Sequence, residues 1–185
     1  MILPIYAYGS PVLKRVAEDI TPEYPELQQL IADMFETMES SEGVGLAAPQ
    51  IGKSVRIFIV DARIYAEDDP SLKDFRRVFI NAHILEEEGE DVALQEGCLS
   101  VPKIHEEVVR PSRLLIRYVD EQFESHEEWY DGMAARIIQH EYDHLDGILF
   151  PERLSPLKRR LVRGKLRDIS RGDVDVSYKM VFPNK

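Results

Sequence analysis

The pattern of hydrophobic and polar positions along the chain predicts three helices. In residues 26–40 the apolar side chains recur at intervals of three and four, the spacing of a helix with one buried face. Residues 132–145 contain no proline and several alanines and isoleucines, which suits a second helix. Ser155-Pro156 opens a third helix. Its inner face is expected at five apolar positions: Leu157, Leu161, Val162, Leu166 and Ile169.

Strands are predicted between the first two helices. Residues 55–60 and 78–81 are rich in β-branched and aromatic side chains, which favour strands. Apolar residues alternate through 108–119 and again around 123–130, which predicts a hairpin that turns at residues 120–122. Helices combined with such strands indicate a mixed fold.

Other stretches are expected to be irregular. The polar residues 62–77 read as a surface loop. The block of carboxylates at 86–91 surrounds Gly89 and favours a solvated turn between strands over an acidic cation site. The tail, residues 173–185, is expected to be β-like at best or disordered.

Composition places the chain among globular proteins of the cytoplasm. Its 185 residues are 44% hydrophobic and 31% charged, which predicts one domain over residues 1–185. A net charge of −11 argues against general nucleic-acid binding, and no specific DNA partner is expected. The N-terminus shows no secretory signal, and no apolar run is long enough to span a membrane. The single cysteine, Cys98, excludes an internal disulfide.

The strongest chemical signal is the H-E-x-x-H pattern from His140 to His144. In a helix, residues four apart lie on the same face, so His140 and His144 can point both imidazoles at one metal ion. Glu141 lies close enough to reach a water bound to that ion. The pattern also occurs by chance on solvated helices, so a third ligand is needed to establish a catalytic site.

The sequence offers more than one third ligand. Cys98 is the better candidate, because a thiolate binds zinc or iron strongly and its neighbour Gly97 helps to present it. Asp168 on the predicted third helix is the alternative, and it would make the chain a general metallopeptidase. A non-catalytic metal module would need a fourth protein ligand, for which no candidate is evident. The three remaining imidazoles are expected to have ordinary surface or core roles: His83, His105 and His126.

Three motifs, in order, resemble the signatures of peptide deformylases. They are Gly43-Val44-Gly45-Leu46-Ala47-Ala48-Pro49-Gln50, Glu96-Gly97-Cys98-Leu99-Ser100 and His140-Glu141-Tyr142-Asp143-His144. The resemblance implies an α+β fold in which mostly antiparallel sheets wrap around a central metal-bearing helix. It also implies removal of the formyl group from the N-terminal formyl-methionine of nascent chains, with release of formate.

The resemblance further implies a set of roles. The metal ligands would be Cys98, His140 and His144, with water in the fourth position and Glu141 as general acid and base. The bound cofactor would be one divalent metal ion, natively Fe(II), although zinc, nickel or cobalt suits the same ligands. The remaining matches are the oxyanion donors Gln50 and Leu99 (backbone N–H), the substrate-binding Val44, Gly45 and Gly97, and the supporting pair Glu96 and Arg110.

Two positions raise separate expectations. Arg136 lies one turn before His140, where it is expected to line the methionine pocket with its head in water. The third helix is strongly basic, and its cations are Lys158, Arg159, Arg160, Arg163, Lys165, Arg167 and Arg171. This charge favours either a plain solvated face or a surface that docks on ribosomal RNA.

Overall fold

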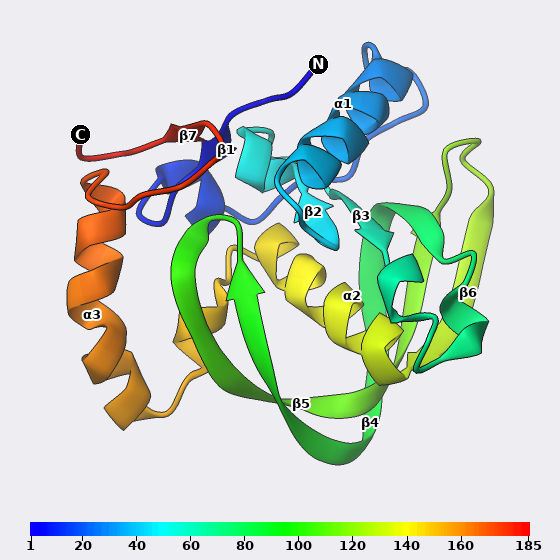
Figure 1. Ribbon diagram of the computed structural model, residues 1–185. Helices are drawn as coiled ribbons and strands as arrows, with labels where there is room; N and C mark the ends of the chain where they lie inside the picture. The colour runs from blue at the N-terminus through cyan, green and yellow to red at the C-terminus, as the bar shows by residue number, and fades with distance from the viewer.

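Helix α2 (Gly132–Leu145) runs through the middle of the molecule, and the main sheet wraps around it (Figure 1). The computed structural model describes residues 1–185. Ala135, Ile138 and Leu145 of α2 are fully buried in a hydrophobic cluster that also contains Phe58 and Phe79 of the sheet. The predicted central helix is therefore confirmed, and apolar packing on the sheet holds it in place.

The main sheet has five strands in the order β2-β3-β4-β5-β6, and all neighbouring strands are antiparallel. Its strands are β2 (Gly45–Ala47), β3 (Ile57–Asp61), β4 (Arg76–Cys98), β5 (Val101–Val119) and β6 (Ser125–Asp131). This arrangement confirms the expected α+β class with mostly antiparallel sheet. The hairpin of β5 and β6 turns at residues 120–124, close to the predicted position.

Strands β4 and β5 are far longer than the sequence pattern indicated. They span 23 and 19 residues and curl beneath α2 (Figure 1). The turn predicted at residues 86–91 is wrong, because this block lies inside β4. Gly89 has a φ of +87°, and the pairing with β5 shifts between Glu88 and Asp91. The glycine therefore marks a bulge, which bends the strand without ending it.

Two outer helices flank the sheet. Helix α1 (Leu27–Ser40) and helix α3 (Pro156–Ser170) match the predicted segments closely. The inner face predicted for α3 is only partly right, since Leu157 and Leu161 are 64% and 69% exposed. Of the five predicted positions, only Val162, Leu166 and Ile169 are buried. The five predicted positions cover half of the helix circumference at 100° per residue, and the body of the protein covers only one side.

The first and last strands of the chain lie side by side. Strand β1 (Ile5–Tyr6) pairs in parallel with β7 (Met180–Val181), so the tail is ordered. Five short 3₁₀ turns connect the other elements: Pro11–Lys14, Ala48–Ile51, Arg63–Tyr65, Pro70–Leu72 and Phe150–Arg153. Two of them lie in the surface loop predicted at 62–77. No helix has the length and apolar character needed to cross a membrane.

Gly147, which ends α2, provides a test of this packing. Its φ is +75°, and an added Cβ would lie 2.6 Å from the Lys14 carbonyl oxygen. We predict that Gly147→Ala lowers the free energy of unfolding by about 1–3 kcal/mol, because both the backbone and the contact become strained. Urea unfolding of the metal-loaded protein measures the change.

Gly164→Ala is the matched control. Gly164 lies inside α3, and an added Cβ there meets nothing within 4 Å. Alanine should stabilise this helix by roughly 0.5–1 kcal/mol. Equal effects of the two substitutions would contradict the account of Gly147.

Candidate metal centre and active-site cleft

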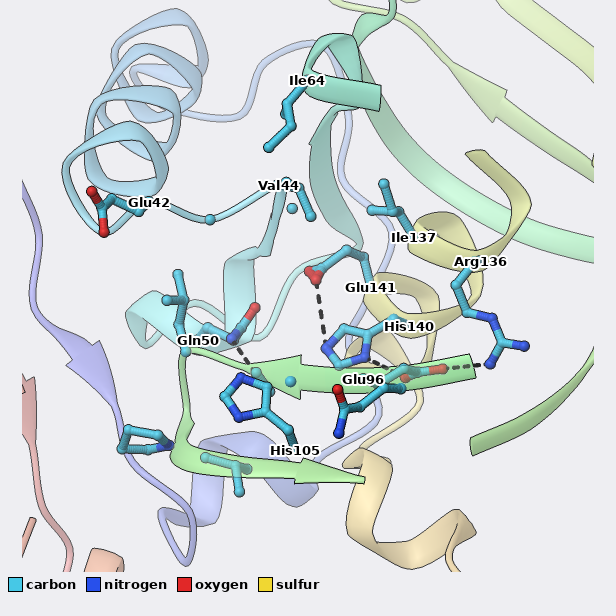
Figure 2. A pocket seen from close by; sticks show the side chains of 18 of the residues that line it. Glu42, Val44, Gln50, Ile64, Glu96, His105, Arg136, Ile137, His140 and Glu141 are labelled. Carbon is cyan, nitrogen blue, oxygen red and sulfur yellow. Dashed lines mark hydrogen bonds and ion pairs between the residues drawn. The ribbon is translucent and has the colours of Figure 1, made fainter. Parts of the chain in front are cut away.

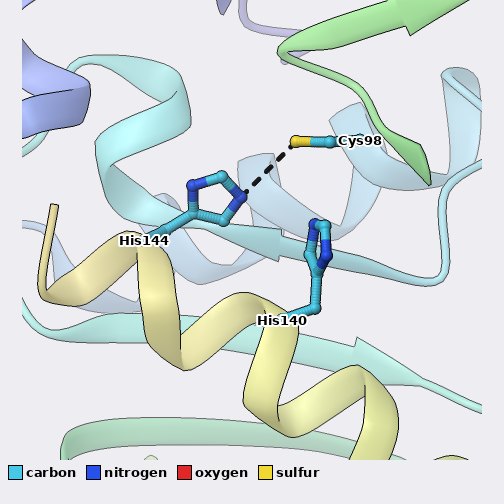
Figure 3. A group of neighbouring side chains, drawn as sticks. All are labelled: Cys98, His140 and His144. Atoms are coloured by element: carbon cyan, nitrogen blue, oxygen red, sulfur yellow. Dashed lines mark hydrogen bonds between the residues drawn. The ribbon is translucent and has the colours of Figure 1, made fainter. Parts of the chain in front are cut away.

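Cys98, His140 and His144 come together at one point in the fold (Figure 3). Their ligand atoms all lie within 4.8 Å of one another, and Cys98 Sγ is 3.5 Å from His144 Nε2. The two histidines occupy adjacent turns of α2, and Cys98 is the last residue of β4. One thiolate and two imidazoles suit a divalent transition metal and leave a coordination position for a reactant.

A buried carboxylate fixes the orientation of His140. Glu96 Oε1 lies 2.7 Å from His140 Nδ1, so His140 Nε2 is the nitrogen free to face the cluster. Arg110 donates to both Glu96 oxygens, at 2.6 and 3.0 Å. Burial alone would raise the pKa of Glu96, but hydrogen bonds from His140 and Arg110 hold this pKa well below its usual range. Glu96 is therefore an anion that orients the imidazole.

Arg136 differs from its expectation. It borders the cleft, but its guanidinium is not in water, since the residue is only 7% exposed. It donates to Glu96 Oε2 at 2.8 Å and to the Val108 and Val92 carbonyls at 2.9 and 2.6 Å. Glu96 provides the opposite charge that allows an arginine to be buried here.

Glu141 lies beside the cluster in a buried position (Figure 2). Its Oε1 is 3.8 Å from His140 Nε2, while its Oε2 has no hydrogen-bond partner in the protein. Burial raises the pKa of Glu141 to about 7. A Cβ on Gly45 would lie 2.8 Å from Glu141 Cγ, so glycine at this position makes room for the carboxylate.

Hydrogen bonds fix the amide orientation of Gln50. Its Oε1 accepts from the Ala47 N–H at 3.0 Å, and its Nε2 donates to Ser100 Oγ at 3.1 Å. Nε2 also lies 3.5 Å from Cys98 Sγ. An amide nitrogen carries two hydrogens: one is donated to Ser100 Oγ, and the other points at Cys98 Sγ, a weak acceptor that the oxygen of a ligand beside Cys98 can replace.

These residues border one cleft of about 570 Å³ (Figure 2). Nine of the eleven site residues implied by the family resemblance line it: Val44, Gly45, Gln50, Glu96, Gly97, Cys98, Leu99, His140 and Glu141. The other two, His144 and Arg110, are buried and do not line the cleft. Sequence reasoning did not find the lining residues of the tail, at 176–178. The only available signal was the alternation of apolar residues with the polar Asp175, Ser177 and Lys179 in residues 174–180.

The other candidates lie elsewhere or have different surroundings. Asp168 is exposed on α3 and is not part of the metal cluster, so the alternative ligand set is wrong. His83 and His126 have acidic partners at the surface, as expected, at 3.0 and 2.8 Å. His105 differs, since it borders the cleft, and a Cβ on Gly97 would lie 2.7 Å from its ring.

The geometry agrees with comparisons to known proteins. A family model described as polypeptide deformylase matches residues 2–160. The chain belongs to this family. A peptide deformylase of Christiangramia forsetii is 53% identical over 100% of this chain and 97% of its own length. One of Cytophaga hutchinsonii is 51% identical over 100% of both chains.

Solved structures of the family have the same fold. The peptide deformylase of Legionella pneumophila superposes with a TM-score of 0.81 at 37% identity and covers 94% of this chain and 98% of its own. That of Thermus thermophilus also gives a TM-score of 0.81, at 40% identity, over 91% of this chain and 97% of its own. The identities and coverage support an enzyme of this family, with an α+β fold.

We predict that Cys98→Ala reduces bound metal from about one ion per chain to nearly none, because only two protein ligands remain. Metal analysis after dialysis measures this directly. Asp168→Ala is the control, and it should keep full metal content because Asp168 lies outside the cluster. Full metal content in the Cys98 variant would mean that another side chain supplies the third ligand.

Proposed function

We propose that this cleft carries out the deformylase reaction of the family, with one divalent metal ion held by Cys98, His140 and His144. The enzyme removes the N-formyl group from the formyl-methionine of nascent polypeptides and releases formate. The observation that carries the assignment is the three-donor cluster, within 4.8 Å, beside the buried Glu141. Three ligands match a catalytic site, whereas a structural site has four.

We assign Fe(II) as the native metal, although the same donors suit zinc, nickel or cobalt. When bound, the metal supplies Lewis acidity, which polarises a carbonyl and lowers the pKa of water. Glu96 and Arg110 support the site by holding His140 with its Nε2 toward the cluster. Arg110 thus acts on the proposed metal ligand through Glu96, which contacts His140 directly.

Glu141 is the proposed general base and acid. Its free Oε2 can take the proton from the attacking water as the formyl carbon becomes tetrahedral. The same carboxyl then gives the proton to the amine nitrogen that leaves as the C–N bond breaks. A pKa near 7, produced by burial, suits a group that must both accept and donate near neutral pH.

Gln50 and Leu99 are the proposed oxyanion donors. Gln50 Nε2 lies 3.5 Å from Cys98 Sγ and therefore beside the reacting centre. Leu99 follows Cys98 in the chain, so its backbone N–H belongs to the peptide next to the same sulfur. Fixed donors of this kind stabilise the negative charge that develops on the formyl oxygen.

The peptide substrate is proposed to bind as an added strand. Strand β2 is an edge of the main sheet, and the last part of β4 pairs only with β5. The Val44 carbonyl accepts from the Asp61 N–H at 2.9 Å, so the polar groups of the next residue, Gly45, point away from β3. Gly97 lines the same cleft. The proposed contacts to the peptide substrate thus come from Val44, Gly45 and Gly97.

We also propose that residues 1–185 form a single catalytic domain, since α2 packs on strands from both halves of the sheet. Because the substrate is a nascent chain, we propose the cytoplasm as its location. Formate release from an N-formylmethionyl peptide by protein purified without oxygen and loaded with Fe(II) tests the function. The metal-stripped protein is the control. Absence of formate from the loaded enzyme would overturn the proposal.

We predict that Glu141→Gln lowers kcat by a factor of about 10² or more, the scale of a lost general acid and base. Metal content should stay near normal, because Glu141 does not supply a donor atom of the cluster. Glu127→Gln makes the same change on the exposed surface of β6 and should retain full activity. Wild-type turnover by the Glu141 variant would remove this residue from the mechanism.

Ribosome docking through α3 is a further part of the proposal. Arg159, Arg160 and Arg163 are exposed. A hollow of about 280 Å³ lies beside the helix, and Arg159, Arg163 and Arg167 contribute to it. Cations grouped on one helix of a protein with a net charge of −11 would attract RNA phosphates. Contact with the ribosome would bring the cleft close to emerging chains.

We predict that replacing Arg159, Arg160 and Arg163 with glutamate abolishes cosedimentation with ribosomes at low salt. The wild-type interaction should weaken steeply as salt increases, since it depends on phosphate contacts. The control replaces Lys53, Lys73 and Arg117, three exposed cations away from α3, with glutamate. Its net charge equals that of the α3 variant, and it should still cosediment. Hydrolysis of free formyl peptides should be unchanged in both variants. Equal cosedimentation of both variants would exclude α3 as the docking surface.

A further inference from the structure

The C-terminal segment forms part of the cleft, although it lies beyond the residues that the family model matches. That match ends at residue 160, whereas residues 176–178 line the cleft. The segment continues from the end of α3 to β1, with which it pairs in parallel (Figure 1). Tyr178 in this segment and Leu99 both pack against the same hydrophobic cluster, and the Tyr178 hydroxyl contacts the Leu99 carbonyl. A late part of the chain therefore contacts the turn that follows Cys98.

This turn has an unusual conformation for its length. Leu99 and Ser100 are the two residues between the paired Cys98 and Val101. Two-residue hairpin turns favour types with positive φ, often with glycine, because these match the twist of the strands. Neither Leu99 nor Ser100 has a positive φ. The local sequence therefore gives the turn little support, and its conformation depends on contacts from elsewhere.

Three hydrogen bonds supply that support. The Tyr178 hydroxyl donates to the Leu99 carbonyl at 2.7 Å. The Tyr8 N–H donates to the Ser100 carbonyl at 2.9 Å, and Gln50 Nε2 donates to Ser100 Oγ at 3.1 Å. Only the bond from Tyr178 reaches Leu99 itself.

We propose that Tyr178 is a positioning residue for deformylation, whose hydroxyl fixes Leu99 so that the Leu99 N–H meets the developing oxyanion. The inference rests on the proposed function, in which this N–H is an oxyanion donor. Holding the carbonyl restrains rotation of the peptide that follows Leu99, and so restrains the orientation of the peptide before it. Oxyanion donors act through fixed geometry, and small displacements cost rate.

Tyr178→Phe tests the proposal, because phenylalanine keeps the packing and removes only the hydroxyl. We expect kcat per bound metal ion to fall roughly tenfold with KM nearly unchanged, as for an interaction made only in the transition state. Backbone hydrogen exchange in residues 98–101 of the metal-loaded enzyme should become faster. Tyr118→Phe is the matched control, since Tyr118 is 4% exposed and its hydroxyl lies near Glu128, away from the cleft.

The outcomes separate this inference from the proposed function. If the wild-type enzyme releases no formate, the proposed function fails. If the wild type is active and Tyr178→Phe keeps its kcat per metal ion, the positioning role is wrong. A higher KM with unchanged kcat would also overturn it, because Tyr178 would then only contact substrate. If the Tyr178 and Tyr118 variants lose the same fraction of kcat per metal ion, the loss reflects lower stability of the fold, and the positioning role is wrong.

Discussion

The site depends on one buried carboxylate, that of Glu96. It accepts hydrogen bonds from Arg110 and Arg136, and it lies 2.7 Å from His140 Nδ1. These partners come from β5 and α2, while Glu96 lies on β4, two residues before Cys98. A buried anion is costly unless it is fully paired, so the native arrangement is the one that satisfies Glu96. The same contacts set the position of the thiol relative to the two imidazoles.

The charge network continues past Glu96 and joins the site to the outer part of the fold. Arg110 also donates to Asp143 at 2.9 Å, and Asp143 accepts from Arg153 at 2.7 Å. Asp143 lies within the H-E-x-x-H motif, between the two histidines. Alternating charges thus connect β4, β5, α2 and the turn before α3. Each charge is compensated by its neighbour, which allows a mostly buried polar layer beneath an open cleft.

The length of β4 and β5 explains how two distant motifs meet. The bulge at Gly89 bends β4 under α2 and brings Cys98 to the face that carries His140. A shorter hairpin with a true turn at 86–91 would separate the cysteine from the helix. The carboxylates of this block remain exposed, so their polarity is consistent with a bent strand as well as with a turn. The turn was predicted wrongly because exposed carboxylates occur both in turns and in bent strands.

The sequence by itself determined the elements and groups whose signal is local. Periodic apolar residues identified the three helices, motif spacing indicated His140 and His144 as metal ligands, and the family resemblance added Cys98. Tertiary structure decided the features that depend on distant partners. Burial of Arg136 requires Glu96, and order in the tail requires β1. The contact between Tyr178 and Leu99 joins residues 79 positions apart. Such pairings depend on how the elements pack, and no local pattern of residues encodes them.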